Sequence, residues 1–296
     1  MLEKFGLDFT VERIPLVGTF NGEVIETPYI GLLNSKTKHY IHKCNQSYTV
    51  VQNEQLLDAV MDAASRFSDQ MELNFGGVID GGAKVYMQLA FKAPSLINDD
   101  EIRQHITVLD CHDGTRALSA GVGDITMSCS NQFLKFYKEG VTKLYHNVTL
   151  EKKVRELPML LETALKRSVK QIEIYERMFS REVNENDIDG MVNAVIGYSK
   201  ALPQEKLDDK STKAINIMND VYNSIKEEMS TKGTNLWGLH SGITRYTTHG
   251  YFANAANKGK DKASQENRLR AIIIGKTYNL NGKSMDFANR LLMEKV

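Results

Sequence analysis

The feature that most constrains the fold is a change in hydrophobic periodicity near residue 150. Before it, short segments alternate apolar and polar residues, as strands with one buried face do. After it, apolar residues recur every three or four positions, which is the spacing of one helix face. Strands followed by helices predict an α+β fold. We therefore expect an antiparallel β-rich core over 1–150 and a helical region over 151–296, which either packs on that core or folds separately.

The first region contains several segments with strand character. Predicted short strands occupy 9–17, 38–43 and 47–51. Two hairpins follow, one pairing 71–75 with 83–91 and the other pairing 102–109 with 115–122. Asp113-Gly114 supplies the positive φ angles that the second turn needs. We expect a helix with Asn53 as its N-cap, and a second helix over 131–139 after the two hairpins.

The second region has the 3.6-residue period of amphipathic helices. Helices are predicted over 158–179, 187–201, 212–229 and 235–252, with one more at the end of the chain. The polar, locally basic stretch 254–269 is typical of a mobile loop.

Composition limits the classes of protein that fit. The chain has 296 residues, with 37 Lys and Arg against 37 Asp and Glu. Any basic surface for nucleic acid must therefore be local. The three cysteines have neither disulfide-scaffold nor zinc spacing. No apolar run reaches the roughly 18 residues of a membrane span, and the first residues lack signal-peptide character. We expect a protein of the cytoplasm.

A search for catalytic motifs gives no enzyme class. Gly275-Lys276-Thr277 resembles the end of a phosphate-binding loop, but Arg270 stands where that motif needs glycine. We therefore expect neither a cofactor nor a metal, and no enzymatic activity. The alternative is an enzyme whose site is assembled by folding from scattered residues. Its candidate residues are His105, Asp110, His112, Asp113, Trp237 and His249.

Several segments together resemble one family. They include LDFTVERIPL, SYTVVQNEQLLD, GGAKVYMQLAF, HITVLDCHDGTRALSAGVGDITMSCSNQF and NLWGLHSGITRYTTH. Their order is similar to that of the phage and plasmid proteins grouped as domain of unknown function 932. The resemblance runs from about Leu7 to His249.

A remote similarity links that family to phage single-strand annealing proteins of the Erf, RecT and Redβ kind. The resemblance implies a strand-strand-strand-helix core, which the predicted strands within 71–91 and 102–123 and the helix over 131–139 would form. It also implies a DNA recombination protein that binds single-stranded DNA, anneals complementary strands without ATP, and assembles as a ring or filament. A phage accessory protein that binds and inhibits a host defence or host enzyme is the alternative.

Local clusters of basic and aromatic residues supply the candidate contacts for DNA. Lysine and arginine neutralise phosphates, and tyrosine rings stack on unpaired bases. Arg103 and Arg116 flank one predicted hairpin turn, which favours their proximity. The predicted nucleic-acid-binding residues are Lys36, Lys38, Tyr40, Lys43, Lys84, Tyr86, Arg103, Arg116, Lys152, Lys153 and Arg155.

Overall fold

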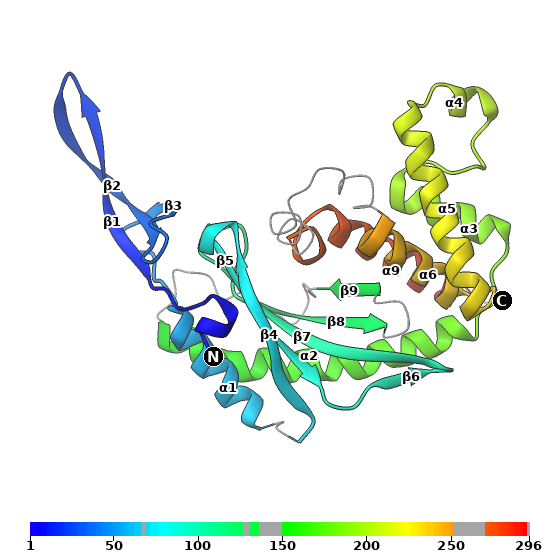
Figure 1. Ribbon diagram of the computed structural model, residues 1–296, viewed down its shortest axis with the longest axis horizontal. Coiled ribbons are helices and arrows are strands. Elements are labelled where there is room, and N and C mark those ends of the chain that lie inside the picture. The colour runs from blue at the N-terminus through cyan, green and yellow to red at the C-terminus, as the bar shows by residue number, and fades with distance from the viewer. Residues whose placement is uncertain (67–68, 127–130, 136–149, 251–269, 295–296) are drawn as a thin grey trace. The chain divides into compact units, whose positions relative to one another are not determined.

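The computed structural model describes residues 1–66, 69–126, 131–135, 150–250 and 270–294. Antiparallel sheets occupy the first half of the chain and helices the second (Figure 1), so the predicted α+β class is confirmed.

The chain divides into two compact units, each built from three separate segments. The first unit contains Met1–Ala93, His105–Val122 and the described part of Phe136–Arg167. The second contains Pro94–Gln104 and the described parts of Gly123–Lys135 and Ser168–Val296.

A three-stranded antiparallel sheet opens the first unit. Its strands, in the order β1-β2-β3, are β1 (Val11–Phe20), β2 (Glu23–Asn34) and β3 (Tyr40–Asn45). The β1–β2 hairpin, blue in Figure 1, extends past β3. The strand predicted over 47–51 is absent there, because a turn follows β3 and the chain then runs on without a strand partner. The Gln52 side chain bonds the N–H and C=O of Val11 instead.

The second sheet contains both predicted hairpins. Its strands are β4 (Met71–Ile79), β5 (Lys84–Phe91), β6 (Ser95–Ile97), β7 (Asp100–Cys111), β8 (Ser119–Thr126) and β9 (Asn131–Lys135). They follow the order β4-β5-β7-β8-β9, and β6 pairs with β7. Gly81 and Gly82 have φ angles of 65° and 103° in the β4–β5 connection, which glycine adopts without a Cβ clash.

The prediction of a helix over 131–139 is wrong for residues 131–135, which form strand β9. Its short apolar pattern fits either period, and hydrogen bonding beside β8 decides in favour of a strand. Residues 136–139 lie outside the described residues.

Helix α1 (Asn53–Ser65) packs into the core of the first unit. Leu56, Val60 and Ala63 lie on its buried face, as its period predicts. The predicted N-cap is one residue off, because Gln52 caps the helix through a capping box with Gln55. The side chain of Asn53 is buried, and it donates hydrogen bonds to the backbone carbonyls of Leu7 and Phe9.

The remaining helices, apart from the short α4, are those that the sequence pattern predicts, with shifted ends. They are α2 (Leu150–Phe179), α3 (Glu185–Ile196), α4 (Gln204–Asp208), α5 (Thr212–Lys232), α6 (Leu236–Arg245), a π-helical turn (Tyr246–Gly250) and α9 (Lys276–Met293). Pro158 lies inside α2 rather than at its start. The predicted loop 254–269 lies outside the described residues.

Helices α5 and α6 approach each other closely in the core of the second unit. A Cβ atom on Gly242 would lie 2.4 Å from the Cα of Ile225, so glycine permits this contact. Trp237 of α6 is buried in the same core, with its ring 4.7 Å from that of Tyr175.

Among the described helices, none combines the length and apolarity that a membrane crossing requires.

Candidate functional site

One side of the β1–β2–β3 sheet exposes a row of aromatic and aliphatic side chains. Strand alternation and the register of the three strands place these residues on one side. We call that side the outer face, and it carries Ile14, Leu16, Phe20, Ile25, Tyr29, Tyr40 and Lys43, together with the carboxylates of Glu12 and Glu23. The side chains of Phe20, Tyr29 and Tyr40 keep 66%, 39% and 46% of their surface exposed. Exposed rings on a sheet are the surface on which unpaired bases stack.

The opposite side of this sheet faces the core of the first unit. Leu32 is fully buried there and belongs to the core cluster. The Asn34 side chain donates to the backbone carbonyl of Gly81 at 3.0 Å. The opposite side is therefore covered near Leu32 and Asn34, whereas Val17 and Val24 leave it exposed at the far end of the hairpin.

Two close contacts fix the rings on the outer face. A Cβ atom on Gly31 would lie 2.8 Å from Cε2 of Tyr40, so the Tyr40 ring rests against the bare backbone of β2. Lys43 stands opposite Gly31 in the register. Its Nζ lies 4.4 Å from the centre of the Tyr29 ring, within the range of a cation–π contact.

The predicted lysines near this face differ in whether they already form an ion pair. Lys36 pairs with Asp8 at 2.5 Å, and its hydrogen bond to that carboxyl group lowers the pKa of Asp8. Lys38 and Lys43 are both exposed. Neither forms an ion pair with any residue that the structure describes. They are therefore the two predicted lysines best placed to meet a phosphate.

Lys84 and Tyr86 of β5 are buried, with 5% and 1% of their surface exposed. Lys84 forms ion pairs with Asp80, at 2.9 Å, and with Asp113. Burial lowers the pKa of Lys84, but its bonds to these two carboxylates outweigh burial and raise it. Lys84 therefore supports the fold at the β4–β5 and β7–β8 turns, Tyr86 packs against Gly77 of β4, and neither presents a surface to DNA.

The other predicted contacts are dispersed. Arg103 is exposed on the part of β7 that belongs to the second unit, whereas Arg116 is half-buried in the first unit. Lys152, Lys153 and Arg155 lie in α2, and their side chains are outside the described ones.

The residues of the alternative enzyme site are divided between the units. His105, Asp110, His112 and Asp113 belong to the first, and Trp237 and His249 to the second. Burial lowers the pKa of His105 to about 4. Within the described part of the chain, no three His, Cys, Asp or Glu side chains are arranged to hold a metal.

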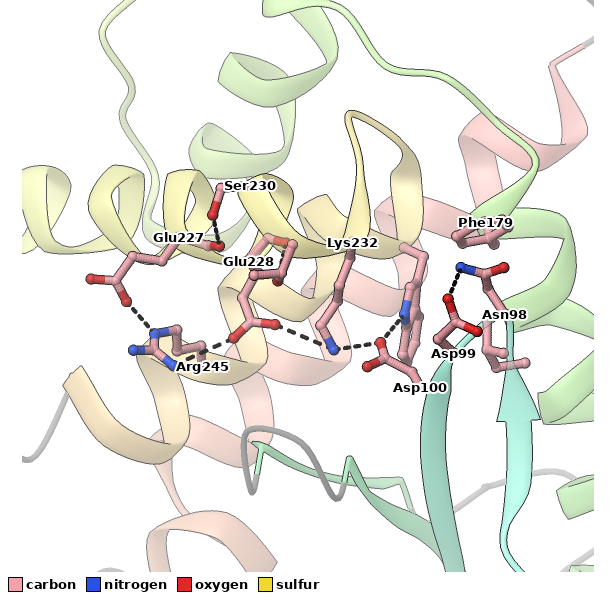
Figure 2. Close-up of a pocket in the computed structure, with 12 residues that line it drawn as sticks. Asn98, Asp99, Asp100, Phe179, Glu227, Glu228, Ser230, Lys232 and Arg245 are labelled. Carbon is pink, nitrogen blue, oxygen red and sulfur yellow. Dashed lines mark hydrogen bonds and ion pairs between the residues drawn. The ribbon is translucent and has the colours of Figure 1, made fainter.

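The second unit contains a pocket of about 520 Å³, shown in Figure 2. This volume lies in the range of small-molecule sites. Its walls come from the β6–β7 turn, the end of α2, the last turns of α5, and α6. The polar lining residues with charge are Asp99, Asp100, Glu227, Glu228, Lys232 and Arg245.

A chain of ion pairs runs along this pocket (Figure 2). The side chain of Lys232, 5% exposed, lies 2.6 Å from Asp100 and 3.3 Å from Glu228. Trp237 Nε1 donates to the same oxygen of Asp100 at 3.0 Å. Arg245 continues the chain, at 3.5 Å from Glu228 and 2.5 Å from Glu227.

Sequence reasoning missed two parts of these sites. Phe20 and Tyr29 lie on strands whose alternation is broken by the register shift between Pro15 and Val17. Glu228 and Lys232 carry a readable signal, because opposite charges four residues apart meet on one helix face. Their link to Asp100 joins residues 132 positions apart, which spacing alone does not reveal.

The chain matches the model of one protein family, described as Domain of unknown function (DUF932), over residues 41–273. The chain belongs to this family. The match begins at β3 and ends before α9, so it covers most of both units. Neither the curated proteins nor the solved structures contain a significant match to the chain.

Proposed function

We propose that this protein of the DUF932 family binds single-stranded DNA along the outer face of the β1–β2–β3 sheet. The observation that supports the proposal is the combination of three exposed rings, Phe20, Tyr29 and Tyr40, with Lys38 and Lys43, which form no ion pair with the described residues. Rings stack on bases of any sequence, and lysines neutralise the phosphates between them.

The geometry favours a single strand over a duplex. Bases in a duplex already stack on each other, so flat exposed rings add little to duplex binding. The outer face offers ring surface together with few charges, and duplex binding depends mainly on charge. The neutral balance of the whole chain is compatible with a local site of this kind.

Fluorescence anisotropy tests the proposal directly. A labelled strand of about 30 nucleotides is titrated with the full chain at two salt concentrations, with a duplex of the same sequence as the control. We expect tighter binding to the single strand, weakening as salt rises. Absence of binding at low salt, or equal affinity for the duplex, would overturn the proposal.

We extend the proposal to annealing. In the manner of the phage proteins of the Erf, RecT and Redβ kind, the protein would bring complementary strands together without ATP, as an oligomer in a phage-infected host cell. Self-association has a candidate surface at the end of the β1–β2 hairpin, where Val17 and Val24 are exposed on the side opposite Phe20. Mixing two complementary labelled strands, with and without ATP, measures the annealing rate, and light scattering measures the oligomer.

A second candidate function is the binding of another protein. The exposed aliphatic residues Val17 and Val24, on the side of the hairpin opposite Phe20, support it, because neighbouring exposed apolar side chains mark protein contacts. Recovery of one stoichiometric host protein by the tagged chain, lost in the variant Val24→Lys, would favour this function. Nucleic acid binding that survives Val24→Lys would separate the two functions.

A further inference from the structure

The β1–β2–β3 sheet separates its charges along its length. The hairpin end, residues 16–28, contains two glutamates and neither lysine nor arginine. The other end, residues 29–46, contains three lysines and neither aspartate nor glutamate. On the outer face, Glu23 therefore lies toward the hairpin turn, whereas Lys43 lies at the β3 end.

Apolar side chains fill the outer face between these two charges. Phe20, Ile25 and Tyr29 remain 66%, 49% and 39% exposed. Exposed apolar side chains that adjoin one another mark contacts with other protein molecules. An apolar centre with charged groups at its margin is also the usual composition of such a contact.

The spacing along β2 makes this face complementary to itself. Two copies can pack face to face with their β2 strands antiparallel and the two-fold axis midway between Ile25 and Tyr29. Ile25 of each copy then meets Tyr29 of the other, because both lie two residues from the axis. Glu23 meets Gly31, beside which Lys43 stands on β3. A two-fold axis repeats each contact, so both ends of the face pair opposite charges.

The register of β1 agrees with this arrangement. Phe20 stands opposite Glu23, and Ile14 stands opposite Gly31, so Phe20 of one copy lies over Ile14 of the other. Glu12 is the carboxylate of the outer face at the β3 end, and it lies one position beyond Ile14 on the same face. It falls level with the hairpin turn of the second copy and therefore outside the overlap.

The dimensions of the face allow a weak contact. Packed sheets lie about 10 Å apart, a gap that a glutamate and a lysine side chain span together. The overlap is roughly 30 Å long and two or three strands wide, so it buries less than about 1,000 Å² in total, the size of transient interfaces. We therefore expect a dimer that forms and separates readily.

We propose that two copies of this chain pair through their outer faces in antiparallel orientation and form a closed dimer. Glu23 of each copy pairs with Lys43 of the other, and Ile25 packs against Tyr29. The dimer covers the rings of the proposed DNA contact, so the face serves either a second copy or a single strand. Dimer formation itself requires no DNA, so its test is independent of the test of DNA binding.

Sedimentation equilibrium of the full chain without DNA tests the proposal. The protein is examined from about 1 to about 200 µM, where a weak contact passes from separated to associated. We expect the average mass to rise from that of one chain toward that of two. A chain that stays monomeric over this range would overturn the proposal.

Charge reversal locates the contact. Glu23→Lys places like charges at both ends of the dimer, and Lys43→Glu does the same with the opposite sign. Each variant should weaken the dimer about tenfold, since two exposed ion pairs become two repulsions. Glu72→Lys, an equal charge change at an exposed position on β4, is the control and should leave the association unchanged. Thermal unfolding verifies that each variant is folded.

A mixture of the two variants tests the two-fold arrangement. In a mixed pair, lysine at position 23 faces glutamate at position 43, and glutamate at position 23 faces lysine at position 43. We therefore expect Glu23→Lys and Lys43→Glu to associate with each other about as tightly as the wild type does. The double variant, which carries both changes in one chain, should regain the dimer in the same way.

Two further results would overturn the proposal. One is a dimer that Glu23→Lys leaves unchanged, as expected for a contact through Val17 and Val24 on the opposite side of the hairpin. The other is a failure of both the mixture and the double variant to recover association.

Discussion

Lys43 Nζ lies 4.4 Å from the centre of the Tyr29 ring, and both side chains stand on the outer face of the first sheet. Lys43 covers part of the Tyr29 ring, so a base can stack on the neighbouring rings of the outer face. The ammonium group of Lys43 then remains close to the phosphate of that nucleotide. This pair is therefore the centre of the proposed DNA contact.

Removing the rings should weaken binding to a single strand. Stacking contributes about 1–3 kcal/mol per base, so we expect Tyr29→Ala and Tyr40→Ala each to lower affinity about tenfold. Anisotropy with the labelled strand measures the change. Phe75→Ala is the matched control, because Phe75 is an exposed ring on β4, away from the outer face. An equal loss in the control would contradict a specific stacking surface.

Removing the lysines should change the salt dependence. Each phosphate contact with a single strand contributes about 0.7 to the slope of log affinity against log salt. We expect Lys38→Gln and Lys43→Gln each to reduce the slope by about that amount. Lys226→Gln, exposed on α5, should not alter it. A slope that stays constant in all three variants would mean that the phosphates are bound elsewhere.

The buried pair of Lys84 predicts a stability effect rather than a binding effect. Lys84→Met leaves the carboxylates of Asp80 and Asp113 close together without their cation, and we expect a loss of about 2 kcal/mol in unfolding free energy. Urea denaturation measures it. Lys36→Met removes an exposed ion pair with Asp8 and should change stability little. Similar losses in both variants would show that the burial of Lys84 is unimportant.

Asp124 predicts a pH-dependent stability. Burial raises the pKa of Asp124 to about 7, although the hydroxyl group of Tyr175 donates to it and acts in the opposite direction. The folded state therefore holds a proton that the unfolded state has lost between about pH 4 and pH 7. Stability from this group is complete below about pH 4 and is lost as pH rises to about 7.

The variant Asp124→Asn isolates this contribution, because the asparagine cannot titrate. The unfolding free energy of the wild type relative to the variant should fall from pH 4 to pH 7 and level off above. His105, whose pKa burial lowers to about 4, gives the opposite trend in both proteins and cancels in the comparison. Parallel pH profiles would contradict a buried, proton-binding Asp124.

Elements with a long, regular period were predictable from the sequence. The buried face of α1 and the paired strands β4 and β5 follow directly from their apolar spacing. Strand β9 was not predictable from the sequence. Its five residues are too few to distinguish the two-residue period of a strand from the 3.6-residue period of a helix. A short segment takes its structure from its neighbours in the sheet.

The candidate sites were predictable only in part. Tyr40 and Lys43 lie on the outer face, as a basic and aromatic cluster suggests. Lys84 and Tyr86 have the same residue types, yet both faces of β5 are covered, so alternation did not distinguish an exposed side from a buried one. The pocket depends on contacts between Asp100 and α5 that local patterns do not record.

The interleaving of the two units has a consequence for how this protein can be dissected. Strand β7 and helix α2 each contribute residues to both units. A truncation at any single position therefore removes part of a sheet or a core from at least one unit, and neither unit can be expressed intact as a contiguous fragment. A single crossover between two genes therefore cannot exchange one whole unit and keep the other, because each unit is built from three separate segments of the chain.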